Sequence, residues 1–217
     1  MSPSADKYKS FKMAASMVQS VTEDKTIKHE VFPSFLERYF TAKYQIDTNG
    51  KTAEDFCILQ HSNKICVITV AGGHPIVRDK MKVEKVDFQV TANTNRMDNK
   101  VIGKNKKGAQ NLQSESILCK VHCSGGKSYT IYSCIKGKLV EVNEILFSHP
   151  QLLVEKPNTE GYVAIILVRL SDYDSQFQRL ISEDEYGEVL SSRANELDRP
   201  ETLTLEGGKH AGNDPPT

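Results

Sequence analysis

The stretch IYSCIKGKLVEVNE, Ile131 to Glu144, is the part of the sequence that decides the fold class. Val140 and Val142 alternate with the polar Glu141, which is typical of a β-strand with one buried face and one wet face. Lys136-Gly137-Lys138 precedes this strand, and a glycine between two lysines predicts a tight turn, because glycine tolerates the positive φ that such turns need.

Outward from this stretch, the same period of two recurs. Ser124-Gly125-Gly126-Lys127 is expected to be a hairpin tip, and the polar segment Asn93–Gly108 an exposed loop. Short strands at roughly ten-residue spacing favour a small β-barrel or sandwich. The expected strands are Phe56–Gln60, Ile65–Val70, Lys85–Thr91, Ile117–Cys123, Ser128–Ile135, Leu139–Val142 and Tyr162–Leu170.

Two helices are expected outside the strand pattern. Pro33 and Ser34 can start a short helix, whose apolar side chains would pack down as a lid: Phe35, Leu36, Tyr39 and Phe40. Ser182 and Glu185 form a capping box that predicts a C-terminal helix running to Leu197.

The length of 217 residues fits one domain with additional segments. We expect a disordered arm over residues 1–30, one domain over 31–197 and a disordered tail over 198–217. No apolar run approaches the roughly 18–20 residues of a membrane span, and the N-terminus lacks a secretory signal. Five cysteines without such a signal indicate reduced thiols in the cytosol or nucleus.

Ile131–Glu144 resembles the lipoyl/biotinyl hammerhead motif, most of all that of the H-protein of the glycine cleavage system. Glu160–Ala164 and Leu180–Tyr186 agree with this resemblance. The fold that it implies is mainly β with minor α, a barrel-sandwich hybrid or lipoyl-like hammerhead with a short N-terminal helix and a C-terminal helix.

The sequence is also similar to one branch of that fold, the Abitram or Simiate family. The resemblance runs from about Val31 to Leu190 through CILQHSN, ICVITVAGGHP, NKVIGKNKKGAQ, VEVNE and EKPNTEGYVAIIL. It implies a non-enzymatic protein without a cofactor that binds monomeric and filamentous actin. It also implies a place in the nucleus, including speckles, and in the cytoplasm, including lamellipodia and growth cones. Self-association stays open.

Lys127 is the candidate for lipoyl attachment, which is the alternative function. When Tyr132-Ser133 is aligned on the H-protein pattern, the attachment position falls on Gly126, one residue before Lys127. A slip of one residue turns a side chain to the other face of a hairpin. The flanking residues also lack an acidic frame, so a surface turn lysine is the preferred interpretation.

Metal binding and catalysis have weak support in the sequence. Two groups of potential metal ligands lie close together in the sequence: Cys57, His61 and Cys66, and Cys119, His122 and Cys123. Within the second, the cysteines alternate inward and the histidine outward, so buried core thiols explain all five cysteines better than a zinc site. No GxSxG elbow and no carboxylate pair suited to acid–base chemistry occurs. His61 and His74, beside turns, are expected to be exposed.

The net charge of zero hides a segregation along the chain. Residues 78–138 carry 13 basic and five acidic side chains, a net charge of +8, and residues 172–201 carry nine acidic and three basic ones, a net charge of −6. An ordinary solvated surface is one interpretation. The other is an acidic partner for a basic loop, with these contact residues: Lys100, Lys104, Lys106 and Lys107. Nucleic acid is disfavoured because no aromatic residues interleave the lysines, although a nuclear adaptor that binds protein or RNA remains an alternative.

Overall fold

The structure is a computed structural model that describes residues 34–197. The predicted arm over residues 1–30, the predicted tail over 198–217 and Pro33 lie outside the described residues. Most of the described elements are antiparallel strands, as the sequence predicts, and the helices are short apart from the C-terminal one. Within residues 34–197 no helix is long and apolar enough to span a membrane.

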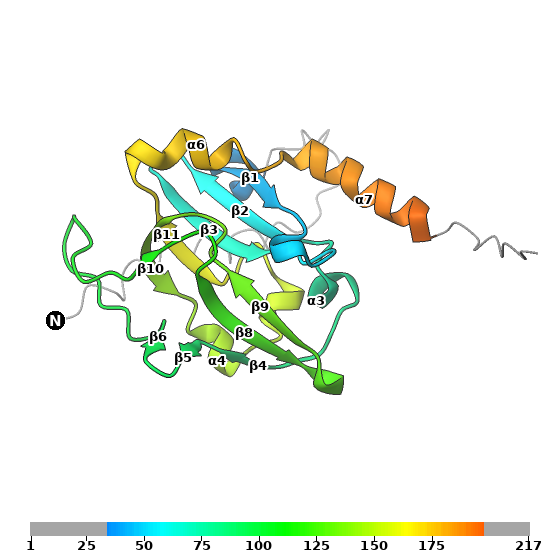
Figure 1. Cartoon of the computed structure of the whole chain (residues 1–217), viewed down its shortest axis with the longest axis horizontal. Helices are drawn as coiled ribbons and strands as arrows, with labels where there is room; N and C mark the ends of the chain where they lie inside the picture. Colours follow the sequence, from blue (N-terminus) through cyan, green and yellow to red (C-terminus); the bar gives the residue numbers. More distant parts are fainter. Residues whose placement is uncertain (1–33, 198–217) are drawn as a thin grey trace, which may run out of the picture.

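The larger sheet has six strands in the order β1-β2-β3-β11-β10-β7 (Figure 1). All of its neighbouring strands pair antiparallel. Their bounds are Phe40–Gln45 for β1, Phe56–His61 for β2, Ile65–Val70 for β3, Ala164–Leu167 for β11, Gly137–Val142 for β10 and Asn111–Leu112 for β7.

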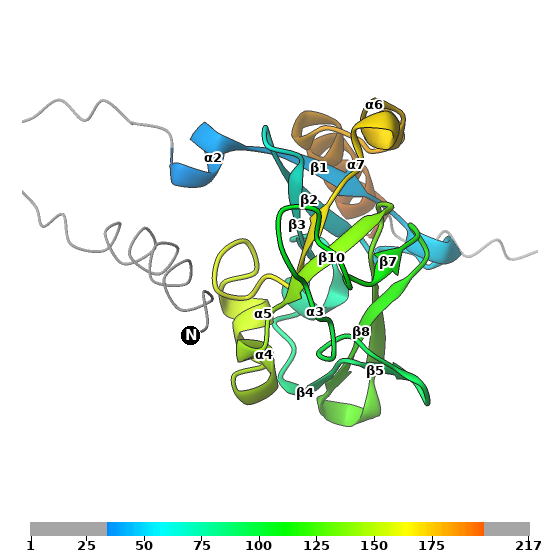
Figure 2. The same ribbon diagram turned by 90° about the vertical axis from the view of Figure 1, so that its left-hand side faces the viewer.

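A three-stranded sheet, in the order β4-β8-β9, packs against the larger one, and a two-stranded ribbon of β5 and β6 lies beside it. In Figure 2, β1 and β2 lie at the top and β4 and β8 at the bottom. The bounds are Val83–Asp87 for β4, Ile117–Cys123 for β8, Ser128–Tyr132 for β9, Gln89–Thr91 for β5 and Thr94–Asn95 for β6.

The main core lies between these two sheets. Ile58 and Ile68 of the large sheet and Val121 and Ile131 of the small sheet are fully buried in the same cluster. A second, smaller cluster lies on the outer face of β1–β3 and contains Tyr186 of the C-terminal helix. The architecture is therefore a two-layered sandwich, as predicted from the short alternating strands.

Six α-helices of the described part of the chain connect or flank the sheets. Their bounds are Phe35–Tyr39 for α2, Pro75–Arg78 for α3, Ile145–Ser148 for α4, Leu152–Glu155 for α5, Tyr173–Phe177 for α6 and Glu183–Leu197 for α7. Ser182 caps α7 through its predicted partner Glu185, whose carboxylate accepts hydrogen bonds from the Ser182 backbone N–H and hydroxyl at 2.6 and 2.7 Å. The prediction that Tyr39 packs down as part of a lid is wrong, because this residue is 51% exposed. Leu36 does pack on the outer cluster.

Two further expectations need correction. Gly137 is the first residue of β10 and does not lie in a turn. A Cβ there would come within 2.6 Å of Ile166 Cγ2, so glycine is needed for close strand contact. Cys134 takes the positive φ of 60° in the preceding segment. The predicted strand Lys85–Thr91 is broken in two, since the Asp87 carboxylate accepts a hydrogen bond from the Gln89 N–H at 3.0 Å.

Candidate functional site

The basic loop, residues 96–110, is fixed at its base by buried and half-buried polar side chains. Arg96 is 9% exposed and donates hydrogen bonds to the Ile117 carbonyl at 2.9 Å and to Gln110 Oε1 at 2.6 Å. Asn99 donates to the Leu139 carbonyl at 2.9 Å and accepts from the Gln110 N–H at 2.8 Å. The segment that the sequence predicts as an exposed loop therefore has an ordered base.

The tip of the basic loop is a small hairpin. The N–H groups of Ile102 and Lys107 each donate to the other residue's carbonyl, at 2.9 and 3.0 Å. Ile102 is 70% exposed, so the tip presents an apolar side chain to solvent. Figure 1 shows this loop projecting from one end of the molecule, beside β10.

The four predicted contact lysines lie together on this loop but do not share one environment. Lys100, Lys104 and Lys107 are exposed, whereas Lys106 is half-buried and has a φ of 50°. Lys138 of β10 joins them, because its ammonium group donates to the Asn105 carbonyl at 2.8 Å. The sequence analysis placed Lys138 in a turn. Lys138 directly precedes the alternating residues of the predicted strand, and this position could have indicated that its side chain points toward the loop.

The lysines of the loop are not neutralised within the described part of the chain. No carboxylate of residues 34–197 lies within 4 Å of the ammonium groups on the loop or of Lys138. In Figure 1 the loop and the acidic helix α7 lie at opposite ends of the long axis. The basic loop and the acidic helix are therefore separated in space, although Lys136 of the basic segment lies 3.7 Å from Asp172 of the acidic one, and the loop keeps a positive field.

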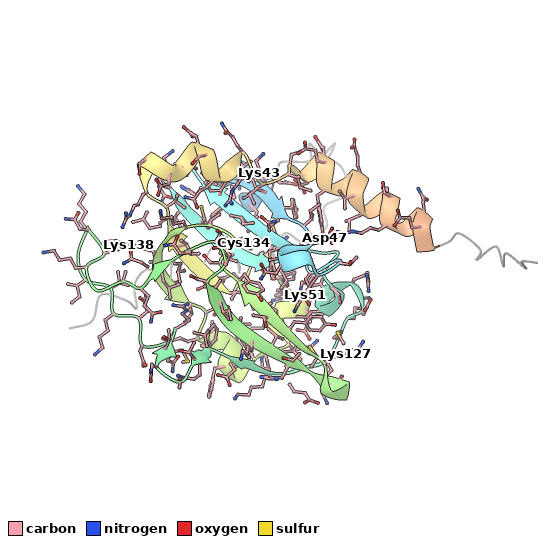
Figure 3. The ribbon with its side chains drawn as sticks, in the orientation of Figure 1. Lys43, Asp47, Lys51, Lys127, Cys134 and Lys138 are labelled. Atoms are coloured by element: carbon pink, nitrogen blue, oxygen red, sulfur yellow. The ribbon has the colours of Figure 1, made fainter. Side chains whose placement is uncertain are left out.

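Lys127 lies on a different corner of the molecule. Gly125 and Gly126 form the predicted tip with φ of 75° and 74°, and Lys127 follows them at the start of the returning strand. Its carbonyl accepts a hydrogen bond from the Cys123 N–H at 2.9 Å, and its side chain is exposed. Figure 3 shows Lys127 far from Lys138. Lys127 is thus at the foot of the tip and not at its apex.

The cysteines are buried, as predicted. Burial raises the pKa of the thiols of Cys57 and Cys66 to about 12 and also raises that of Cys119 and Cys134. Such thiols stay protonated near neutral pH, and a thiol must ionise to act as a nucleophile or to bind a metal. No group of three metal-binding side chains occurs within residues 34–197.

A buried polar cluster that the sequence analysis missed attaches α7 to the sheet. Asp55 is fully buried and accepts hydrogen bonds from the Tyr186 hydroxyl at 3.1 Å and from Arg193 at 2.5 Å. The Tyr186 hydroxyl also accepts from the Gly73 N–H at 3.0 Å. A Cβ on Gly73 would lie 2.6 Å from that hydroxyl, so the helix can approach only a glycine here.

His74, next to this cluster, corrects another expectation. The sequence suggests an exposed side chain beside a turn, but His74 is fully buried. Its Nδ1 caps α3 by accepting a hydrogen bond from the Ile76 N–H at 3.2 Å. Its Nε2 has no partner among the described residues. Burial lowers the pKa of His74 to about 4, so the ring is neutral near pH 7.

Part of this chain matches a described protein family. Residues 77–193, just over half of the chain, match the family model of the glycine cleavage H-protein. The chain is also similar to a solved glycine cleavage system H protein from Mycobacterium marinum, with a TM-score of 0.47 and 11% identity over 70% of this chain and 97% of that one.

Curated relatives match over most of their length. Protein Abitram of Xenopus tropicalis is 47% identical over 163 residues, 75% of this chain and 89% of the relative. Protein Abitram of Homo sapiens is 46% identical over 76% of this chain and 91% of the relative. Protein Abitram of Drosophila melanogaster is 35% identical over 93% of this chain and 86% of the relative. The chain therefore belongs to the Abitram family and contains a domain of the glycine cleavage H-protein family.

Proposed function

We propose that this chain is a non-enzymatic protein that binds actin through the basic loop. The observation that carries the proposal is the ordered loop tip, on which exposed lysines without a carboxylate partner among the described residues flank the exposed Ile102 along the chain. Cationic side chains around an apolar one are better suited to bind an acidic protein surface than a small free anion. The reason is that the apolar side chain contributes to binding only when a partner removes it from water.

The wider role follows from the Abitram resemblance. We propose that the protein regulates actin polymerisation and filament-based cell projections, binds both monomeric and filamentous actin, and acts in the nucleus, including speckles, as well as in the cytoplasm. Fluorescence microscopy of the tagged full chain together with actin and speckle markers tests the location. A chain that overlaps with neither marker would contradict the proposed location.

Co-sedimentation with filamentous actin tests the binding site. The triple variant Lys100→Gln, Lys104→Gln and Lys107→Gln removes three exposed charges and leaves the turn at Lys106 unchanged. Because an exposed ion pair contributes about 0.2–1 kcal/mol, we expect a loss of affinity of about tenfold. The affinity of the natural chain should also fall as salt rises, since screening shortens the Debye length to about 3 Å at 1 M.

The matched control is a triple variant with the same loss of charge away from the loop. Its substitutions are Lys82→Gln, Lys120→Gln and Lys127→Gln, all at exposed positions. Equal binding by the two triple variants would contradict the loop as the site. Absence of co-sedimentation of the natural chain at low salt would contradict actin binding itself.

Two alternatives remain as outcomes of other measurements. An RNA-binding adaptor would retain RNA as well as actin at the same salt, but the exposed apolar side chains of the loop are Met97 and Ile102, neither of which offers an aromatic ring for base stacking. A carrier modified on Lys127 would show a lipoyl mass shift in intact protein from its native source.

A further inference from the structure

A hollow of about 260 Å³ lies at the β7 edge of the large sheet, next to the basic loop. It is lined by Asn111, Leu112, Gln113, Lys136, Gly137 and Arg169. Both of its charged side chains are cationic, and its two side-chain amides can donate hydrogen bonds. This lining is complementary to an anion.

The walls of the hollow are held in place by packing and hydrogen bonds. Gln176 of α6, which is buried, accepts a hydrogen bond from the Lys136 N–H and donates one to its carbonyl at 3.2 Å. Gly137 pairs with Leu112 across β10 and β7. Leu112, 1% exposed, belongs to the main core. The hollow is thus formed before a ligand arrives, which lowers the entropic cost of binding.

The cations of the hollow keep most of their positive field. No carboxylate of residues 34–197 lies within 4 Å of the Arg169 guanidinium. The Lys136 ammonium lies 3.7 Å from the Asp172 carboxylate, which is longer than a hydrogen bond, and its side chain is 47% exposed. The pair therefore neutralises Lys136 only weakly.

The hollow is continuous with the basic loop. Lys138 follows Gly137 in β10, and its ammonium group reaches the carbonyls of Asn105 and Lys106 at 2.8 and 3.4 Å. Figure 3 shows Lys138 at the base of the loop. One acidic segment laid along this end of the molecule would meet both surfaces.

We propose that the hollow is a carboxylate-binding subsite that receives an aspartate or glutamate side chain of the acidic protein segment bound by the basic loop. The Arg169 guanidinium can pair with both oxygens of a carboxylate, while Lys136 acts as a point charge on the other side. The inference rests on the proposed function for the identity of the partner, but the anion site itself can be tested without actin.

The test is a titration of the ¹⁵N-labelled full chain with a capped (Asp-Glu)₃ hexapeptide, followed by NMR. We expect saturable shifts of the backbone amides of Gln113, Lys136 and Gly137 as well as of the loop. The double variant Lys136→Gln and Arg169→Gln should weaken peptide binding about fivefold, because two exposed ionic contacts are lost. Lys127→Gln, on a distant corner, should leave the peptide affinity unchanged. Arg169→Lys should have an intermediate affinity, since lysine keeps the positive charge but cannot form the paired hydrogen bonds of a guanidinium group.

Three results would overturn the subsite. These are shifts confined to residues 96–110, equal binding by the double variant and by Lys127→Gln, and tighter binding of inorganic phosphate than of the peptide at this hollow. A spectrum of the double variant that otherwise matches that of the natural chain shows that it is folded. Failure of actin co-sedimentation with intact peptide binding would contradict the proposed partner and leave the carboxylate subsite standing.

Discussion

Replacement of His74 should change how the stability of the protein depends on pH. The ring is fully buried, with Phe56 and Tyr129 at centroid distances of 5.6 and 5.2 Å. Burial lowers its pKa to about 4, and the positive charges of Arg78 and Lys51 act in the same direction. The negative charge of Asp55 raises the pKa of His74, but this effect is smaller than the lowering by burial.

The sign follows from the protons bound in each state. An unfolded histidine has a pKa of about 6.5, so between about pH 6.5 and 4 the unfolded chain binds a proton at His74 that the folded chain does not bind. The free energy of unfolding therefore falls as the pH falls through this window. From the two pKa values, the loss attributable to His74 is about 2 kcal/mol at pH 5 and approaches about 3 kcal/mol at pH 4.

Urea unfolding of the natural chain and of His74→Asn at several pH values from 7 to 4.5 measures this effect. Asparagine keeps a side-chain acceptor for the Ile76 N–H, and it is a preferred helix cap that does not titrate. The variant should be less stable at pH 7 because the smaller side chain leaves a cavity. The difference between the two proteins should then shrink by about 2 kcal/mol between pH 7 and pH 5.

A control histidine separates this effect from general acid sensitivity. His149 is exposed, and His149→Asn should follow the profile of the natural chain. Parallel profiles for the natural chain and His74→Asn would refute the reasoning, because they would mean that His74 takes up a proton equally in both states.

Two further substitutions test the close contacts of the fold. Tyr186→Phe removes the hydroxyl between Asp55 and Gly73 and should lower the free energy of unfolding by about 1–3 kcal/mol, because the buried Gly73 N–H loses its acceptor; an unchanged urea midpoint would contradict this. Gly137→Ala puts a methyl group 2.7 Å from the Leu167 carbonyl oxygen and should cost about 1–3 kcal/mol in the same assay, whereas tolerance of alanine would restore the interpretation as a turn.

Two strands could be predicted from the sequence with their exact bounds, although the alternating stretch Lys85–Thr91 forms two strands and not one. Ile65–Val70 and Ile117–Cys123 have the predicted bounds. Strand β1 was missed because Phe40, its first residue, was grouped with the apolar face of the preceding helix. The alternation of Phe40, Ala42 and Tyr44 was available as a signal. What fixes β1 is its long-range pairing with β2, which local spacing does not show.

Tertiary contacts also explain the shortened last strand and the misplaced histidine. Tyr162 precedes β11 because its carbonyl accepts a hydrogen bond from the Asn143 side chain at 2.8 Å, in place of a strand partner. His74 follows two glycines, which is typical of an exposed turn, but the docking of α7 over Gly73 covers that turn. The lysines of the basic loop could be named from the sequence, whereas Lys138 and the hollow depend on how β10 meets the loop.

The pairing of β3 with β11 determines how much of the chain forms the large sheet. The H-protein family model begins at residue 77, after β1, β2 and β3. Yet β11 pairs along its whole length with β3, from Ala164↔Ile68 to Leu167↔Ile65. Without β3, β11 would be an open edge over the main core, with unpaired backbone groups and exposed apolar side chains. The three preceding strands are therefore part of the same sheet, and the matched residues alone do not make up the structural unit that carries the basic loop.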